Sequence, residues 1–124
     1  MKSKQTKTKE ISRETKQIVL QRQHYKSISG VALTEQSAVF HHVVFRGNQG
    51  VGYEFNIVAL TWEEHRRFHD GLSIFVNGKE RYSNQEFNTL MKNHLKLNYN
   101  GWTEDKCKYK KYFDEKDYGI TRKE

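Results

Sequence analysis

Four of the six histidines in this 124-residue chain lie between positions 41 and 69. His41 and His42 are neighbours, whereas His65 and His69 are four residues apart. Neutral imidazole is a common ligand of zinc and related divalent ions, and histidines at i and i+4 of a helix present two nitrogens to one ion. One histidine of the adjacent pair would complete three protein ligands and leave a coordination position open, as in catalytic metal sites. The spacing therefore predicts a centre that binds one divalent ion.

Two elements must position these histidines. The apolar and β-branched run from Ala38 to Phe45 predicts a strand, in which neighbouring side chains point to opposite faces. His41 and His42 therefore have different tasks, and the alternation leaves open which of them binds the metal. For the second pair, Thr61 followed by Glu64 is a capping box, which predicts a helix from Trp62 to about residue 70.

Between the two elements, residues 46–54 contain three glycines, which we expect to allow positive φ angles in a wide loop. A second strand is expected from Asn56 to Leu60. This order of features resembles the ββα-metal core of the HNH endonucleases, and the ending HRRFHDG is similar to the version in colicin-type nuclease domains. The resemblance rests on the following residues: His41, His42, Gly47 to Gly52, Asn56, His65 and His69.

The common HNH pattern also carries two Cys-x-x-Cys knuckles that bind a structural zinc. Thr61 and Glu64 stand at the knuckle positions before HRRFH, and the upstream segment YKSISG has Ser27 and Ser29 but no cysteine. Both halves of that structural site are therefore missing together.

The resemblance implies a role for each matched residue. His41, His65 and His69 would hold one divalent ion, whose identity (Zn, Ni, Mg or Mn) a three-histidine site leaves open. His42 would be the general base that activates water, since an imidazole with an ordinary pKa of about 6.5 accepts a proton near neutral pH. Asn56 would orient that base through its side-chain amide.

The expected fold class is α+β, a compact ββα-metal core with flanking helices and a small hairpin. Residues 1–10 are predicted to be a disordered basic arm, and residues 11–124 a single nuclease domain with its core at 38–72 and a C-terminal helical extension at 83–118. Within it we expect a helix over about 12–25, a hairpin at Asn77-Gly78, a helix over 84–97 capped by Ser83 and Glu86, and a helix near Trp102 to Phe113. His94 is expected to pack on the apolar face of its helix rather than bind metal.

The formal net charge of +7 is concentrated near the N-terminus, where residues 1–26 hold eight Lys or Arg against two Glu. A polyanion is the natural partner of such a segment, and beside a nuclease-like core we expect double-stranded DNA. Arg66 and Arg67 either contact phosphate or only cover the helix surface. The residues expected to bind nucleic acid are Arg46, Arg66, Arg67, Lys16 and Arg22. Lysines interleaved with aromatic residues at 106–113 suit either single-stranded nucleic acid or an amphipathic helix.

The single cysteine, Cys107, excludes an intramolecular disulfide and a cysteine-rich zinc site, which favours a reducing, cytoplasmic setting. No apolar run of 18 residues is present, so no membrane span is expected. By association with the resemblance, the setting would be a bacterium or a phage-infected host, and the chain part of the DNA-processing equipment of a phage or mobile element.

The predicted function is a metal-dependent DNA endonuclease that nicks or cuts by hydrolysis. The alternative is a non-catalytic nucleic-acid-binding module with a structural metal site. A toxin nuclease is a third, less favoured reading, because the chain has no recognisable delivery segment.

Overall fold

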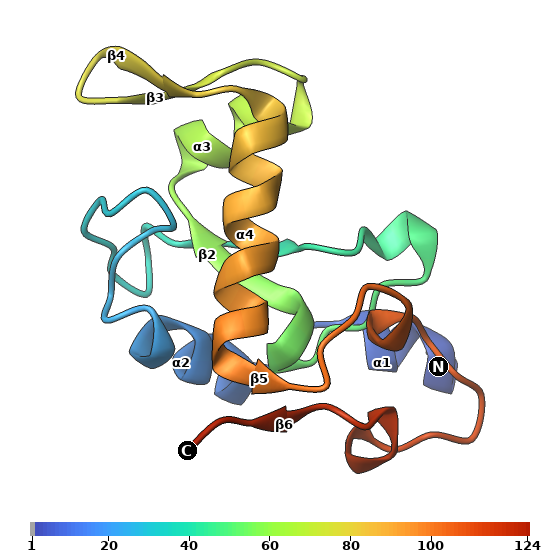
Figure 1. The fold of residues 1–124 in the computed structure, drawn as a ribbon. Coiled ribbons are helices and arrows are strands. Elements are labelled where there is room, and N and C mark those ends of the chain that lie inside the picture. Colours follow the sequence, from blue (N-terminus) through green and yellow to red (C-terminus); the bar gives the residue numbers. More distant parts are fainter. Residues whose placement is uncertain (1) are drawn as a thin grey trace.

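The computed structural model describes residues 2–124 and has the expected α+β architecture, built from helices and three antiparallel strand pairs (Figure 1). The α-helices are α1 (Lys4–Lys9), α2 (Arg13–Arg22), α3 (Trp62–His69) and α4 (Asn84–Asn98). The strand pairs are β1 (Val39–His42) with β2 (Ile57–Leu60), β3 (Ile74–Val76) with β4 (Lys79–Tyr82), and β5 (Tyr99–Asn100) with β6 (Thr121–Arg122).

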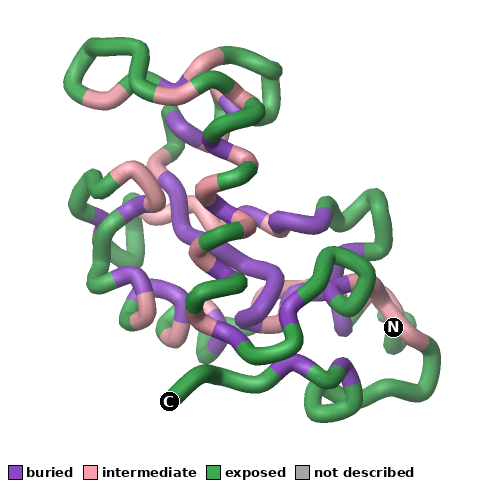
Figure 2. Tube along the Cα trace, viewed as in Figure 1, coloured by how far each residue is buried: buried purple, intermediate pink, exposed green. Residues whose placement is uncertain are grey.

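Strand β2 runs through the centre of the protein and is buried along its whole length (Figure 2). Because side chains alternate along a strand, Val58 and Leu60 join the larger apolar cluster, which includes the inner face of α4. Ile57 and Ala59 point the other way, into a smaller cluster with Val19 and Leu20 of α2. The β1–β2 hairpin is therefore packed on both faces.

The two capping boxes predicted from the sequence are confirmed. Thr61 and Glu64 exchange hydrogen bonds at the start of α3, and Ser83 and Glu86 do so at the start of α4. Helix α4 is the longest element and extends from the β3–β4 hairpin to β5 (Figure 1). Its buried side chains Phe87, Met91 and Leu95 follow at intervals of four residues, as expected for one helix face.

The predicted helix near residues 12–25 is confirmed as α2, which Ser12 caps. The hairpin is also as expected, since Asn77 (φ 54°) and Gly78 (φ 77°) both take the left-handed conformation that a two-residue type I′ turn requires.

The expectation of a disordered arm over residues 1–10 is wrong for most of that segment, although residue 1 lies outside the described part. Residues Lys4–Lys9 form α1, with the Ser3 side chain accepting a hydrogen bond from the Thr6 backbone N–H. A backbone hydrogen bond joins the end of α1 to the loop at residues 46–54: the Gly52 N–H donates to the Thr8 carbonyl at 2.9 Å. Tertiary contact thus orders a segment whose composition favours disorder.

The predicted helix near Trp102 to Phe113 is also wrong, so the helical extension over 83–118 is limited to α4 and two short 3₁₀ turns, at Asp105–Cys107 and Glu115–Tyr118. Individual tertiary contacts fix this segment instead. The Trp102 indole N–H donates to the Phe55 carbonyl at 2.7 Å, and the carbonyl of the buried Cys107 accepts a hydrogen bond from the Val51 N–H at 2.9 Å.

Across the described residues, none of the helices has the length and apolar character that crossing a membrane requires.

Candidate functional site

The register of the β1–β2 hairpin separates the two neighbouring histidines. His41 is paired with Val58 and His42 with Ile57, and directly opposed residues in an antiparallel pair share a face. His41 therefore lies on the side of the larger apolar cluster and of α3, whereas His42 lies on the side of α2. The sequence left open which histidine meets the helical pair, and the register selects His41.

His41 is buried, and its imidazole is surrounded by aromatic rings. The ring centroid lies 5.4 Å from that of His65, 5.4 Å from that of Phe68 and 5.7 Å from that of Phe45. Within the described chain, its Nε2 is buried without a hydrogen-bond partner. Such an atom costs about 1–3 kcal/mol unless an ion or water satisfies it. Burial, and secondarily the other histidines, lowers the pKa of His41 to about 3, so the imidazole is neutral and can donate its lone pair to a metal.

His65 and His69 continue this cluster along α3, with ring centroids 6.2 Å apart. Two imidazoles bound to one tetrahedral ion, with metal–nitrogen distances of about 2.1 Å, have ring centroids about 5 Å apart. The His41–His65 pair matches this spacing, but the His69 ring would have to turn to join it, and its side chain is 76% exposed. Among residues 2–124, no three His, Cys, Asp or Glu side chains form a ready metal-binding group.

His42 has a different environment. Its Nε2 lies 2.7 Å from the backbone carbonyl oxygen of Lys9, at the end of α1. A carbonyl oxygen only accepts hydrogen bonds, so Nε2 carries the proton and the Nδ1 lone pair remains to accept another. The pKa of His42 is lowered mainly by burial, with a further contribution from Arg46, while the Lys9 carbonyl acts in the opposite direction. The Lys9 carbonyl could not be predicted from the sequence, since a backbone acceptor has no residue-type signature.

Asn56 does not contact His42 through any hydrogen bond of the described residues. It is fully buried and ties the two ends of the loop together: its Oδ1 accepts from the Val44 N–H at 2.8 Å, and its amide donates to the carbonyls of Val44 at 3.1 Å and Val51 at 2.8 Å. Asn56 therefore does not orient His42 through its amide, contrary to the prediction from the sequence. It acts on His42 only through the backbone near Val44, which follows the histidine pair.

The glycines of the loop allow close backbone approach rather than positive φ, which corrects the sequence expectation. None of Gly47, Gly50 and Gly52 has a positive φ. A Cβ at Gly50 would overlap the Val44 carbonyl, and a Cβ at Gly52 would overlap the Glu10 carbonyl. Gly52 thus lets the end of α1 approach the loop, and this approach brings the Lys9 carbonyl to His42.

Glu64, at an expected knuckle position, contacts the upstream segment that contains Ser27 and Ser29. Glu64 is buried; its carboxylate accepts hydrogen bonds from the Ser27 hydroxyl at 2.9 Å, from the Ser29 hydroxyl and from the Thr61 N–H at 2.7 Å. Burial raises the pKa of this carboxyl group, against the effect of its hydrogen bonds. A polar cluster therefore joins the two segments that the HNH pattern would join through zinc.

Two of the five predicted nucleic-acid-binding residues lie beside His42. Lys16 and Arg46 line a surface hollow of about 520 Å³ together with His42 and Phe40, and the Lys16 ammonium lies 5.6 Å from the centre of the Phe40 ring. Of the two arginines on α3, Arg67 is engaged within the protein, whereas the Arg66 side chain is about half exposed. Arg66 lies 4.0 Å from Asp70, and Arg67 donates to the Ser73 carbonyl at 2.6 Å while stacking 4.4 Å from the Phe75 ring centre.

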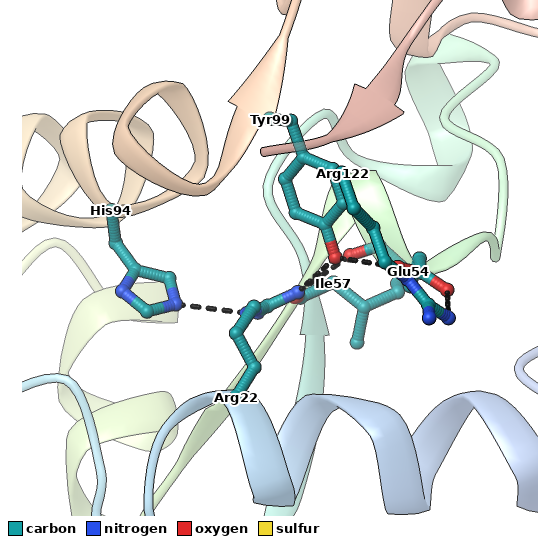
Figure 3. Close-up of polar contacts among 6 residues, drawn as sticks. All are labelled: Arg22, Glu54, Ile57, His94, Tyr99 and Arg122. Carbon is teal, nitrogen blue, oxygen red and sulfur yellow. Dashed lines mark hydrogen bonds and ion pairs between the residues drawn. The ribbon is translucent and has the colours of Figure 1, made fainter. Parts of the chain in front are cut away.

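The prediction that Arg22 binds nucleic acid is wrong, because its guanidinium is turned into the protein (Figure 3). It donates to His94 Nε2 at 2.9 Å, to the Tyr99 hydroxyl at 3.0 Å, and to the carbonyls of Glu54 and Ile57 at 2.9 Å and 2.6 Å. The Glu54 carboxylate in turn accepts from Tyr99 and Arg122. His94 is thus a satisfied histidine, as expected, and burial lowers its pKa to about 4.

Comparison of the chain with models of known protein families, with curated proteins and with solved structures gave no match. The assignment of function therefore depends on the geometry described above and on the resemblance of the histidine motifs.

Proposed function

We propose that this protein is a metal-dependent endonuclease that hydrolyses phosphodiester bonds of DNA. The observation that carries the proposal is the buried, unpaired Nε2 of the neutral His41 imidazole, which lies beside His65 on α3. His41, His65 and His69 would hold the ion. When bound, a divalent ion would neutralise the negative charge that develops on the phosphate and on the leaving oxygen.

His42 is the general base of the proposed reaction. Its Nε2–H is committed to the Lys9 carbonyl, so Nδ1 takes a proton from a water molecule as the water oxygen attacks phosphorus. The phosphorus–oxygen bond to the leaving group breaks, and the products are a phosphate monoester and a free hydroxyl. The lowered pKa of His42 keeps the imidazole neutral, and therefore able to act as a base, at neutral pH.

Lys16 and Arg46 bind the substrate phosphate in this proposal. Both line the hollow that contains His42. Positive side chains at this point bind the backbone of DNA without reading its sequence, and their contribution decreases with salt.

The polar cluster of Ser27, Ser29, Thr61 and Glu64 supports the resemblance to HNH endonucleases. Thr61 and Glu64 stand at the knuckle positions before HRRFH, and the Glu64 carboxylate contacts Ser27 and Ser29 of the upstream segment, more than thirty positions away. Contact between these two segments is what a shared core arrangement predicts.

The alternative is a nucleic-acid-binding module in which the metal is structural. Structural zinc sites usually have four protein ligands, and the His41 cluster offers three histidines at most. A cleavage assay separates the two functions: supercoiled plasmid is incubated with the protein and Mg²⁺, Mn²⁺, Ni²⁺ or Zn²⁺, beside His42→Ala and with EDTA.

The endonuclease converts supercoiled plasmid to nicked or linear DNA with at least one metal. His42→Ala lowers that rate by about 10²–10⁴-fold, the usual contribution of a general base, while DNA binding is retained. Plasmid left intact with every metal, despite binding, would support the binding module instead.

A further inference from the structure

A second hollow, on the other side of the loop from His42, adjoins the His41 cluster. It has a volume of about 710 Å³, within the range of about 300–1,000 Å³ typical of small-molecule sites. Two of its lining residues, Phe45 and Phe68, are the aromatic neighbours of His41. The hollow is therefore adjacent to the proposed metal ligand His41.

The lining of this hollow combines an exposed ring with free amide groups. Phe45 is 45% exposed although it packs edge-on against His41. Asn48, in the loop, and Asn88, on α4, both line the hollow, and neither side chain has a hydrogen-bond partner in the described part of the protein. A side-chain amide has donors and an acceptor that match the edge of a nucleobase, and a ring provides a stacking surface.

The charge of the hollow is also suited to a nucleotide. Lys92 is paired with Glu104 at 2.5 Å, whereas the Lys108 ammonium has no ion-pair partner within residues 2–124. The backbone of Lys108 is held beside the loop by its bridge to Gly50, and its ammonium is the one unneutralised charge among the described lining residues. A phosphate beside a bound base would meet that charge.

We propose that this hollow binds an unpaired nucleotide of the DNA strand that passes the proposed cleavage site. The inference rests on the proposed function for the identity of the ligand as DNA. A perfect duplex keeps its bases stacked, so a base enters the hollow only after leaving the helix, which costs a few kilocalories per mole unless the base is already unpaired. The preferred substrate is therefore DNA that contains an extrahelical or single-stranded nucleotide.

The test is equilibrium binding measured by fluorescence anisotropy in EDTA, so that no cleavage occurs. Three labelled DNAs of the same sequence are compared: a perfect duplex, the duplex with one bulged nucleotide, and the single strand. The wild-type protein binds the bulged duplex at least about tenfold more tightly than the perfect duplex, a difference of about 1.4 kcal/mol.

Variants locate the preference. Asn88→Ala reduces the affinity ratio of bulged to perfect duplex to below about threefold, and so does Asn48→Ala, which lies on a different segment and serves if the first variant is poorly folded. The matched control is Asn93→Ala, an exposed asparagine on the same helix that does not line this hollow. It keeps the wild-type ratio.

A wild-type ratio near one, or an equal ratio in Asn88→Ala, Asn48→Ala and Asn93→Ala, would overturn the inference. The outcome is independent of catalysis. A preference for bulged DNA without cleavage by any metal would support nucleotide binding in the hollow and refute the endonuclease function. Cleavage without a preference for bulged DNA would support the endonuclease function and refute nucleotide binding in the hollow.

Discussion

Substitution of Gly52 tests whether the end of α1 orients the proposed base. A Cβ at this position would overlap the Glu10 carbonyl and lie 2.8 Å from the Lys9 carbonyl oxygen, whereas ordinary contact begins at 3.4 Å. In Gly52→Ala the loop and the end of α1 must therefore move apart, by about 0.6 Å at the Lys9 carbonyl to restore ordinary contact. The hydrogen bond from His42 to this carbonyl is 2.7 Å long, so a displacement of that size weakens it.

The expected loss follows from the role of this hydrogen bond. Groups that only orient a reactive imidazole typically contribute about 10–100-fold, so we expect Gly52→Ala to lower the single-turnover rate of plasmid cleavage by that factor. The overlap also lowers the free energy of unfolding by about 1–3 kcal/mol, as for other overpacked sites. Metal binding should not change, because His41 lies on the opposite face of β1.

Gly47→Ala is the matched control in the same loop. Its φ is not positive, and a Cβ there would meet nothing within 4 Å. We expect wild-type cleavage and thermal stability. If Gly52→Ala remained folded by circular dichroism and cleaved as fast as Gly47→Ala, the proposed role of the Lys9 carbonyl would be refuted.

Four further outcomes are expected. Arg22→Met should lower the free energy of unfolding by about 2–4 kcal/mol, because the Glu54 and Ile57 carbonyls, the Tyr99 hydroxyl and His94 Nε2 lose their shared donor. Lys16→Ala should instead weaken DNA binding and reduce its salt dependence, with little change in urea denaturation. The pKa of His94 is about 4 when folded, below the ordinary 6.5, so the unfolded chain binds more protons between these values. His94 should therefore contribute a loss of stability of at most about 3 kcal/mol as the pH decreases from 6.5 to 4. His94→Gln, whose amide oxygen can accept from Arg22, should remove that contribution. Asn56→Ala should lower the free energy of unfolding by about 2–4 kcal/mol, since the buried Val44 N–H and two carbonyls lose their partner, and unchanged urea midpoints for Asn56→Ala would contradict the fastening role of that amide.

Local patterns predicted much of the fold. Thr61 with Glu64, and Ser83 with Glu86, marked the starts of α3 and α4 because a capping box is encoded within four residues. The Asn77-Gly78 turn was predictable for the same reason. Contacts between distant segments were not. Arg22 sits on a helix pattern that suggests solvent exposure, and only the packing of α2 against β2, α4 and β5 reveals its buried partners.

The candidate site shows the same division. The histidine spacing predicted that His65 and His69 share a helix face, and strand alternation predicted that His41 and His42 diverge. The choice between His41 and His42 depended on the β1–β2 register. All four residues of β2 are buried and apolar, so the sequence does not show which face of the strand meets α3. The sequence shows a glycine at position 52, but not its reason. The carbonyls of Lys9 and Glu10 that approach Gly52 belong to a distant segment, and backbone groups carry no sequence signal.

The most direct measurement is a calorimetric titration of the metal-free protein with Ni²⁺ or Zn²⁺, beside His41→Ala and a control, His24→Asn, which changes an exposed histidine outside the cluster. We expect one ion per chain in the wild type and in His24→Asn. His41→Ala should weaken binding by more than about 100-fold, since even residues that merely orient ligands contribute about 10–100-fold. Equal binding by His41→Ala and the wild type, or no binding by either, would contradict the proposal that the buried Nε2 of His41 is a metal ligand.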